Sequence, residues 1–254
     1  MKRLAIMTCA AAAGISLLVT GCSTLDQIVG KDNWQEWTPQ QTSLQISQSG
    51  SVTETIIESL DKSYYSADEL QDMIARSVKE YNSEHGENSI TVPGYKAENG
   101  RIDLVLVYRT ADDYTSYNQV EYAQGSMLDV QMKGITFPDT FREVSGSRLS
   151  DKAVSSEEAL SHKEYSIAVT NEDHVVQVPG QIRYLSDNAQ LVNSHVAAPS
   201  AESSQTEKEE QQGLVLPSNA VYYETESEGE DPDLSPVQPD KLYIIYEEDP
   251  EQET

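Results

Sequence analysis

The sequence predicts an α+β fold, in which one domain is built mainly from an antiparallel sheet of β-hairpins with one long helix and one or two short helices. Apolar and polar residues alternate over short stretches, which is typical of half-buried strands. Turn-forming pairs such as Asn99-Gly100 separate several of these stretches. A single long segment, from Ser66 to Gly86, has helical periodicity instead. We expect the folded domain to cover residues 42–196.

The first expected element is a β-hairpin. Leu44 and Ile46 alternate with polar residues, and Gln48-Ser49-Gly50-Ser51 supplies a turn. Residues from Val52 to Leu60 then resume as a strand. The pattern and the turn chemistry together predict two paired strands.

The long helix has clear start and stop signals. The Ser66 hydroxyl can cap the first turn, Glu69 completes a capping box, and Tyr65 is placed to pack on Leu70. Gly86 is a suitable stop. The residues expected on the buried face are Leu70, Met73, Ile74, Val78 and Tyr81.

A second hairpin should follow, opening at Ile90 and Val92 and turning at Asn99-Gly100. Its return strand, Ile102 to Tyr108, is apolar at every position except Asp103. Such a run predicts a strand in the middle of a sheet with cover on both faces. Thr110 can then cap a short helix over residues 111–118. Tyr114 and Tyr117 should face the core.

The second half of the domain gives weaker signals. Met127, Leu128, Val130 and Met132 suggest a strand that Ile135 and Phe137 continue, and a short helix is expected at 156–161. Tyr165, Ile167 and Val169 alternate, as do Val176 and Val178, with Asn171-Glu172-Asp173 as the turn between them. Residues 181–185 add another β segment after Pro179-Gly180.

The composition changes at residue 197. From Pro199 to the end there are 16 acidic residues and two lysines, with too little apolar surface to offset chain entropy. We therefore expect residues 197–240 to be an acidic disordered loop. Leu242-Tyr243-Ile244-Ile245-Tyr246 has high β-propensity and should close the domain sheet as a strand over 241–247, before an acidic tail at 248–254.

The N-terminal residues have the pattern of an export signal. Lys2 and Arg3 precede an uncharged stretch from Leu4 to Thr20, which is too short for a stable spanning helix. It ends in Val19-Thr20-Gly21-Cys22, which resembles the lipobox of bacterial lipoproteins. This resemblance implies a signal peptide at 1–21, cleavage between Gly21 and Cys22, and a diacylglyceryl group on Cys22 that binds the lipid bilayer. Residues 22–41 would then be a tether, in which Trp34 and Trp37 pack on the domain or lie at the bilayer interface.

Charge and cysteine content agree with this location. Removal of Lys2 and Arg3 leaves 15 basic and 43 acidic residues, a formal charge of −28. Such a surface is repelled by anionic membranes and offers no basic face for nucleic acid. A covalent lipid anchor is therefore needed to hold the protein at a membrane, and two acyl chains provide one. Cys9 is removed with the signal and Cys22 is lipidated, so no thiol remains for a disulfide, a metal site or a nucleophile.

A wider resemblance indicates only the cellular compartment of the protein. Val178-Pro179-Gly180-Gln181-Ile182-Arg183-Tyr184-Leu185-Ser186-Asp187-Asn188, the closing Tyr-Ile-Ile-Tyr strand, the lipobox and the hairpin-helix-hairpin order are similar to small lipoproteins of Gram-positive anaerobes. This resemblance implies a location outside the cytoplasm, anchored to the cell membrane, and it implies no activity.

Catalytic motifs are incomplete. Ser59-Leu60-Asp61-Lys62 fits the S-x-x-K pattern of penicillin-recognising enzymes and Ser186-Asp187-Asn188 fits their second motif, but K-T-G is absent. Ser59 also ends a strand, where those enzymes start a helix. No G-x-S-x-G elbow or glycine-rich phosphate loop is present. We interpret the serine motifs as coincidence and predict no catalytic residues.

Metal and cofactor sites are not predicted either. His85, His162, His174 and His195 lack the spacing of zinc ligands and lie in or near expected turns, so we expect them to be solvated. The run Glu224-x-Glu226-x-Glu228-x-Glu230-Asp231-Pro232-Asp233 fits no EF-hand loop. Ten of the 14 tyrosines fall in three groups, at 64–65, 108–122 and 222–246. They could form a recognition surface for peptide or glycan, or simply occupy half-buried sheet positions.

The sequence leaves two functions open. The first is a membrane-anchored binding or structural module of the cell envelope, with an envelope protein or glycan as its partner. The alternative is a hydrolase of envelope polymers with an unrecognised carboxylate site. A pocket with two inward carboxylates about 5 to 10 Å apart, one with a raised pKa, would favour the hydrolase.

Overall fold

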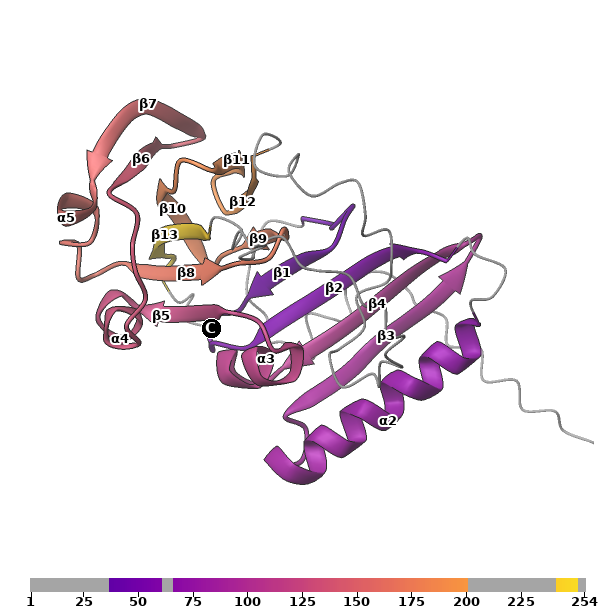
Figure 1. Cartoon of the computed structure of the whole chain (residues 1–254). Coiled ribbons are helices and arrows are strands. Elements are labelled where there is room, and N and C mark those ends of the chain that lie inside the picture. The colour runs from indigo at the N-terminus through magenta and orange to yellow at the C-terminus, as the bar shows by residue number, and fades with distance from the viewer. Residues whose placement is uncertain (1–36, 61–65, 201–240, 251–254) are drawn as a thin grey trace, which may run out of the picture.

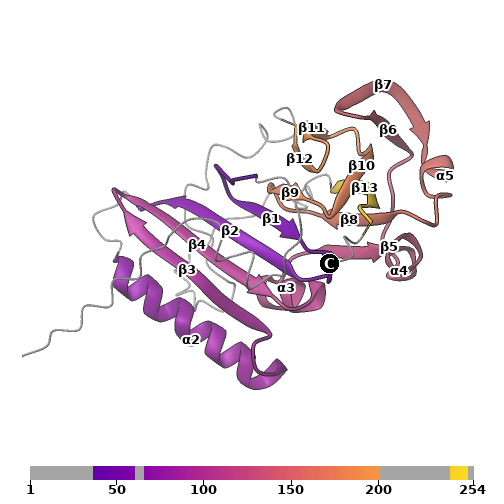
Figure 2. The same cartoon turned by 180° about the vertical axis from the view of Figure 1, so that it is seen from behind.

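The structure, a computed structural model, describes residues 37–60, 66–200 and 241–250 (Figure 1). It confirms the α+β class: two mostly antiparallel sheets lie beside one long helix and three short ones. Figure 2 shows the same arrangement from behind. The largest hydrophobic cluster contains residues from both sheets, so the two sheets share a core.

The first sheet has seven strands in the order β11-β12-β9-β1-β2-β4-β3. Neighbours are antiparallel except β1 and β9, which pair in parallel. Its strands are β1 (Ser43–Ile46), β2 (Val52–Ser59), β3 (Ile90–Glu98), β4 (Arg101–Tyr108), β9 (Val175–Gln177), β11 (Ala189–Asn193) and β12 (Val196–Pro199). The two predicted hairpins, β1–β2 and β3–β4, are confirmed. Asn99 and Gly100 both have positive φ (54° and 74°), as a type I′ turn requires.

The second sheet has six antiparallel strands in the order β5-β8-β13-β10-β6-β7. Its strands are β5 (Tyr122–Ser126), β6 (Thr140–Ser145), β7 (Arg148–Ser155), β8 (Ser166–Thr170), β10 (Gly180–Leu185) and β13 (Leu242–Glu248). The expected closing strand is confirmed, since β13 lies between β8 and β10.

Both faces of β13 are buried. Leu242, Ile244 and Tyr246 belong to the shared core, whereas Tyr243 and Ile245 pack into a second cluster with the helices on the other face of the sheet. This double cover explains a strand with no polar position from 242 to 246.

The expectation that β4 is covered on both faces is wrong. Ile102, Leu104, Leu106 and Tyr108 are buried, but the alternate residues from Asp103 to Val107 are only half-buried. β4 lies next to the edge strand β3 rather than at the centre. Valine suits the open face of a pleated sheet, so its presence there does not require a second layer.

Helices α2 (Ala67–His85) and α3 (Ala111–Asn118) form as expected. The Ser66 hydroxyl accepts the Glu69 amide at 3.3 Å, and Gly86 ends α2 with φ at 112°. Figure 1 shows α2 lying along β3, and its buried residues join the shared core. Tyr65, the expected partner of Leu70, lies outside the described residues.

The segment from Met127 to Met132 is a helix, α4, and not the expected strand. The Ser126 hydroxyl caps it by accepting the Asp129 amide at 3.2 Å. Met127 and Val130 are buried, while Leu128 and Met132 are 63% and 77% exposed. Spacing of three between the buried residues is helical, and the apolar character of the exposed pair concealed it. Ile135 and Phe137 pack on the same cluster from irregular backbone.

Other differences concern connections. Residues 171–174 carry the chain from β8 in one sheet to β9 in the other, so these strands do not form a hairpin. The sequence did not predict strands β5, β6, β7, β11 and β12, and the short helix α5 (Ser156–Ala159) falls within its expected range. β12 runs to Pro199, three residues into the expected loop, whereas residues 201–240 lie outside the described residues.

Trp37 packs against Val175, Val196 and Ala198, while Trp34 lies outside the described residues.

Candidate functional site

A buried carboxyl group lies in the middle of the shared core. Val52, Glu54 and Ile56 occupy alternate positions of β2, so their side chains point to the same face of the sheet. Val52 and Ile56 pack into the core, and Glu54 is only 5% exposed. A carboxylate at such a position is costly unless hydrogen bonds or charges compensate it.

Neighbouring strands and helices supply those partners. Tyr108, on the adjacent strand β4, donates a hydrogen bond from its hydroxyl to Glu54 Oε2 at 2.6 Å. The Asn118 amide of α3 donates in turn to the Tyr108 hydroxyl at 3.1 Å. Tyr108 and Tyr114 also meet edge to face, with centroids 5.0 Å apart. These contacts fix Glu54 between β4 and α3.

A second carboxylate reaches the cluster from the connection between the sheets. The Tyr114 hydroxyl donates a hydrogen bond to Glu172 Oε2. His174 Nδ1 lies 3.6 Å from Glu172 Oε1, and each of these two side chains is 17% exposed. We call Glu54, Glu172 and His174, with their partners Tyr108 and Tyr114, the buried acid cluster.

Burial dominates the protonation of Glu54. It raises the pKa of this carboxyl group from 4.5 to about 7, although His174 and the Tyr108 hydrogen bond oppose the rise. Burial lowers the pKa of His174, but the Glu172 and Glu54 carboxylates outweigh it and leave that pKa raised. Glu54 therefore changes its protonation state near neutral pH.

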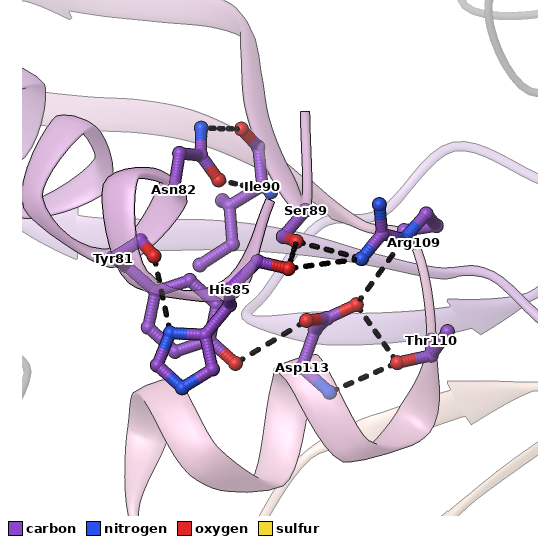
Figure 3. A network of polar contacts seen from close by, with 8 residues as sticks. All are labelled: Tyr81, Asn82, His85, Ser89, Ile90, Arg109, Thr110 and Asp113. Atoms are coloured by element: carbon purple, nitrogen blue, oxygen red, sulfur yellow. Dashed lines mark hydrogen bonds and ion pairs between the residues drawn. The ribbon is translucent and has the colours of Figure 1, made fainter. Parts of the chain in front are cut away.

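A second polar network joins α2 to α3 around the buried Asp113 carboxylate (Figure 3). The Asp113 carboxylate accepts hydrogen bonds from the Thr110 hydroxyl at 2.8 Å and the Tyr81 hydroxyl at 3.3 Å. Arg109 Nε lies 3.8 Å from the same carboxylate. Arg109 also donates to Ser89 Oγ at 2.8 Å, so this network fastens the first turn of the helix that carries Tyr114 and Asn118.

A hollow of about 630 Å³ opens beside this network, between α2 and the edge strand β3. It is a wide, open depression of the surface and not an enclosed pocket. Glu87 is the one acidic residue among those that line the hollow, which are Ala75, Val78, Lys79, Asn82, Ser83, Glu87, Asn88 and Val92.

The structure gives the serine motif Ser186-Asp187-Asn188 a structural role. The Ser186 hydroxyl accepts the Tyr243 amide at 3.0 Å, and the Asn188 amide donates to the Lys241 carbonyl at 3.3 Å. Both contacts hold β13 in place. Ser59 ends β2 in the seven-stranded sheet, where it pairs with Arg101 of β4, and Lys62 lies outside the described residues.

The expectation that all four histidines are solvated is wrong for two of them. His174 belongs to the buried acid cluster, and the His195 side chain is 16% exposed with Nε2 3.1 Å from Asp249 Oδ2. His85 is exposed and stacks on Tyr81, and His162 is partly exposed and stacks on Tyr165. The sequence could not show that the connection bearing His174 turns into the core.

The described tyrosines of the three groups serve the core. Tyr108, Tyr114, Tyr117 and Tyr122 are buried and contact one another edge to face or tilted. Tyr243 and Tyr246 are buried in β13. The other tyrosines of these groups lie outside the described residues. The described members therefore form no exposed recognition surface, and they are buried in the core and not half-buried as the sequence suggested.

Sequence reasoning missed Glu54 and Glu172. A signal for Glu54 was present, because it occupies an inward position between Val52 and Ile56 in a strand of period two. No local signal exists for Glu172, which lies in a polar turn.

Cys22 and Gly21, the predicted lipidation and cleavage residues, lie outside the described residues. No helix in the described part of the chain is long and apolar enough to cross a membrane. Within residues 37–60, 66–200 and 241–250, no three His, Cys, Asp or Glu side chains are grouped so that they could hold a metal ion. No family model, curated protein or solved structure matches the chain.

Proposed function

We propose that this protein is a lipid-anchored lipoprotein outside the cytoplasm, whose folded domain is a binding or structural module of the cell envelope. The observation that carries the proposal is Val19-Thr20-Gly21-Cys22 directly behind an uncharged stretch and a cationic start. A diacylglyceryl group on Cys22 would bind the bilayer stably, which the acidic surface does not do by itself.

The position of the domain suits this arrangement. Trp37 packs on the domain, so at most 14 residues, 23–36, separate the lipidated cysteine from the first packed side chain. Extended chain spans at most about 3.5 Å per residue, so the domain would stay within about 50 Å of the lipid. A module held at that distance can act only on partners at or near the membrane surface.

Binding is favoured over hydrolysis by the placement of the carboxylates. Glycoside hydrolysis needs two carboxyl groups beside the substrate. Glu54 has the raised pKa expected of an acid catalyst, but its side chain faces the shared core and the residue is only 5% exposed. The hollow beside α2 is an open surface depression, and Glu87 is the one acidic residue among those that line it. These facts support a surface that recognises a partner.

The anchor can be tested with the two cysteines of the chain. Cys22→Ala should move the protein from the membrane fraction to the soluble fraction and leave its signal uncut by the lipoprotein peptidase. Cys9→Ala is the matched control, because that residue leaves with the signal peptide, and it should remain lipidated. A Cys22→Ala protein that still partitions into detergent would overturn the proposal.

The module is tested separately, with the mature domain as bait on solubilised envelope membranes. We expect a specific envelope protein or glycan to be recovered. Recovery of no partner, together with turnover in an envelope-polymer cleavage assay, would establish the hydrolase instead.

A further inference from the structure

Strand β3 is an edge strand of the seven-stranded sheet. Within the part of the chain that the structure describes, its nine residues, Ile90–Glu98, pair only with β4. Figure 1 shows α2 running alongside it. The second edge of such a strand presents backbone amides and carbonyls to which an extended peptide can pair.

The hollow between α2 and β3 lies along this edge. Its lining comes from one side of α2, which includes Ala75, Lys79 and Ser83, and from Val92 of β3. Val92 is 38% exposed although it is apolar. An open depression between a strand edge and a helix suits an added strand, because the backbone of that strand pairs with the edge while its alternate side chains lie against the helix.

One residue of α2 already pairs with the beginning of β3 as a neighbouring strand would (Figure 3). The Asn82 side chain donates a hydrogen bond to the Ile90 carbonyl and accepts one from the Ile90 amide, both at 2.8 Å. A primary amide carries the same donor and acceptor as the peptide backbone. Asn82 therefore covers the edge at Ile90, and an added strand would begin beyond it.

A bulge in β3 directs Val92 toward the hollow. The register between β3 and β4 shifts between Thr91 and Gly94, so Val92 has no residue directly opposite it in β4. Bulges of this kind change the direction of a side chain. Val92 also lies two positions after Ile90, whose side chain packs in the shared core with residues of α2. The exposed valine thus offers an apolar contact on the side of the strand that α2 covers.

Charge indicates which kind of segment fits this edge. Residues 67–98, which include α2 and β3, contain seven aspartates or glutamates and three lysines or arginines. The whole chain is also strongly negative, with a formal charge of −26. Like charge disfavours a second copy of the chain at this edge, whereas a cationic segment is attracted to it.

We propose that the edge of β3 binds an extended, basic segment of a partner protein, which adds a strand to the seven-stranded sheet and places alternate side chains in the hollow. This role rests on the proposed function and makes it specific, because the module then recognises a peptide segment and not a glycan. Backbone pairing with β3 supplies affinity, and contacts with Val92, Ala75 and Val78 select the partner's side chains.

A synthetic peptide tests this role on the mature protein in non-ionic detergent. The probe alternates lysine and valine over eight residues, and its control carries a methyl group on every backbone nitrogen, which keeps the charge and removes the donors. Fluorescence anisotropy should show at least about tenfold tighter binding of the probe, since each lost backbone hydrogen bond lowers affinity. Hydrogen exchange should show that the probe protects β3 and not β11, the other edge of the same sheet.

Matched valines on the two edges locate the site. Val92→Lys puts a charge of the probe's own sign in the hollow and should weaken probe binding at least about tenfold. Val192→Lys, the same change at a 51% exposed valine of β11, should leave the affinity within about twofold. Ala75→Arg repeats the test from α2, at an exposed position of the hollow where arginine is also a good helix former.

No binding of the probe, or equal binding of the probe and its methylated control, would overturn the proposal. Equal effects of Val92→Lys and Val192→Lys would do the same, as would a dimer of the unaltered protein that Val92→Lys dissociates. Suppose that the mature domain recovers one envelope partner equally well with and without Val92→Lys. The proposed binding module would then stand, and only its assignment to β3 would be wrong.

Discussion

The Asn188 side chain donates a hydrogen bond to the carbonyl oxygen of Lys241 (3.3 Å), although 53 residues separate them. The Asn188 carbonyl accepts the Ser200 amide at 2.7 Å. Ser200 and Lys241 flank residues 201–240, so both ends of this segment are held by one residue, Asn188.

Shortening this segment should not cost stability. Deleting residues 204–237 leaves six residues between Ser200 and Lys241, enough to span about 20 Å. Closing a shorter loop costs less entropy, so we expect the free energy of unfolding to be unchanged or to rise by about 1 to 2 kcal/mol. Urea denaturation of the chain from Ser23 onward measures it, and a loss of more than about 2 kcal/mol would contradict the proximity of the two ends.

A stop codon after Asp240 is the contrasting change. It removes β13 from between β8 and β10 and takes five buried side chains from two hydrophobic clusters. Each large side chain contributes about 1.5 to 3 kcal/mol, so their sum approaches the whole stability of a domain. We expect this variant to lose its cooperative thermal transition in circular dichroism. A melting temperature like that of the full chain would show that β13 is dispensable.

Gly180 should not accept any side chain. A Cβ there would lie 2.0 Å from the Glu247 carbonyl oxygen and 2.7 Å from the Glu248 Cα, both of which are backbone atoms of β13. Gly180→Ala must separate β10 from β13 and should destabilise the protein by about 2 kcal/mol or more. Gly146→Asn is the control, because Gly146 has open space around it and asparagine tolerates its φ of 62°. Similar urea midpoints for the two variants would refute this close approach.

The stability of the domain should fall as the pH rises through neutrality. The pKa of Glu54 is raised from 4.5 in the unfolded chain to about 7 in the folded one, so its contribution is fully present below pH 4.5 and is lost as the pH rises through 7. The raised pKa of His174 acts in the same direction, because its favourable charge is lost as the pH rises through the folded value. The Glu54 term is about 3 kcal/mol.

Glu54→Gln should remove most of this dependence. The variant should resemble the unaltered protein at pH 5 and should be more stable than it at pH 8.5, provided that the amide keeps the Tyr108 bond. Urea unfolding at both values provides the measurement. A variant that is less stable at both values by the same amount would mean that ionisation of Glu54 carries no cost.

Helix α4 predicts unequal effects on stability at two apolar residues. Val130→Ala creates space in a buried cluster and should cost about 1 to 3 kcal/mol. Met132→Gln changes a side chain that is 77% exposed and should alter stability by less than about 0.5 kcal/mol. A strand would bury both residues, since 130 and 132 would share a face. Comparable losses in thermal unfolding would therefore favour the strand over the helix.

In the first half of the domain, local sequence signals correctly predicted where the helices and the second hairpin turn lie. Ser66 and Gly86 bound the long helix, Asn99-Gly100 turns the second hairpin, and Thr110 starts the helix that carries Tyr114. Each signal acts within a few residues, through a cap or a backbone angle, so it can be read without knowledge of the rest of the chain.

The sequence by itself determined the α+β class, both hairpins, the two main helices and the closing strand, and it supplies the whole argument for the lipid anchor at Cys22. Only the tertiary structure decided that β8 and β9 lie in different sheets, that residues 127–132 form a helix, and that β13 rather than β4 is covered on both faces. It also linked Glu54 to the Glu172–His174 pair through Tyr108 and Tyr114. Burial of a side chain depends on what packs over it, and Glu54 and that pair come from segments more than 100 positions apart, so no local pattern can bring them together.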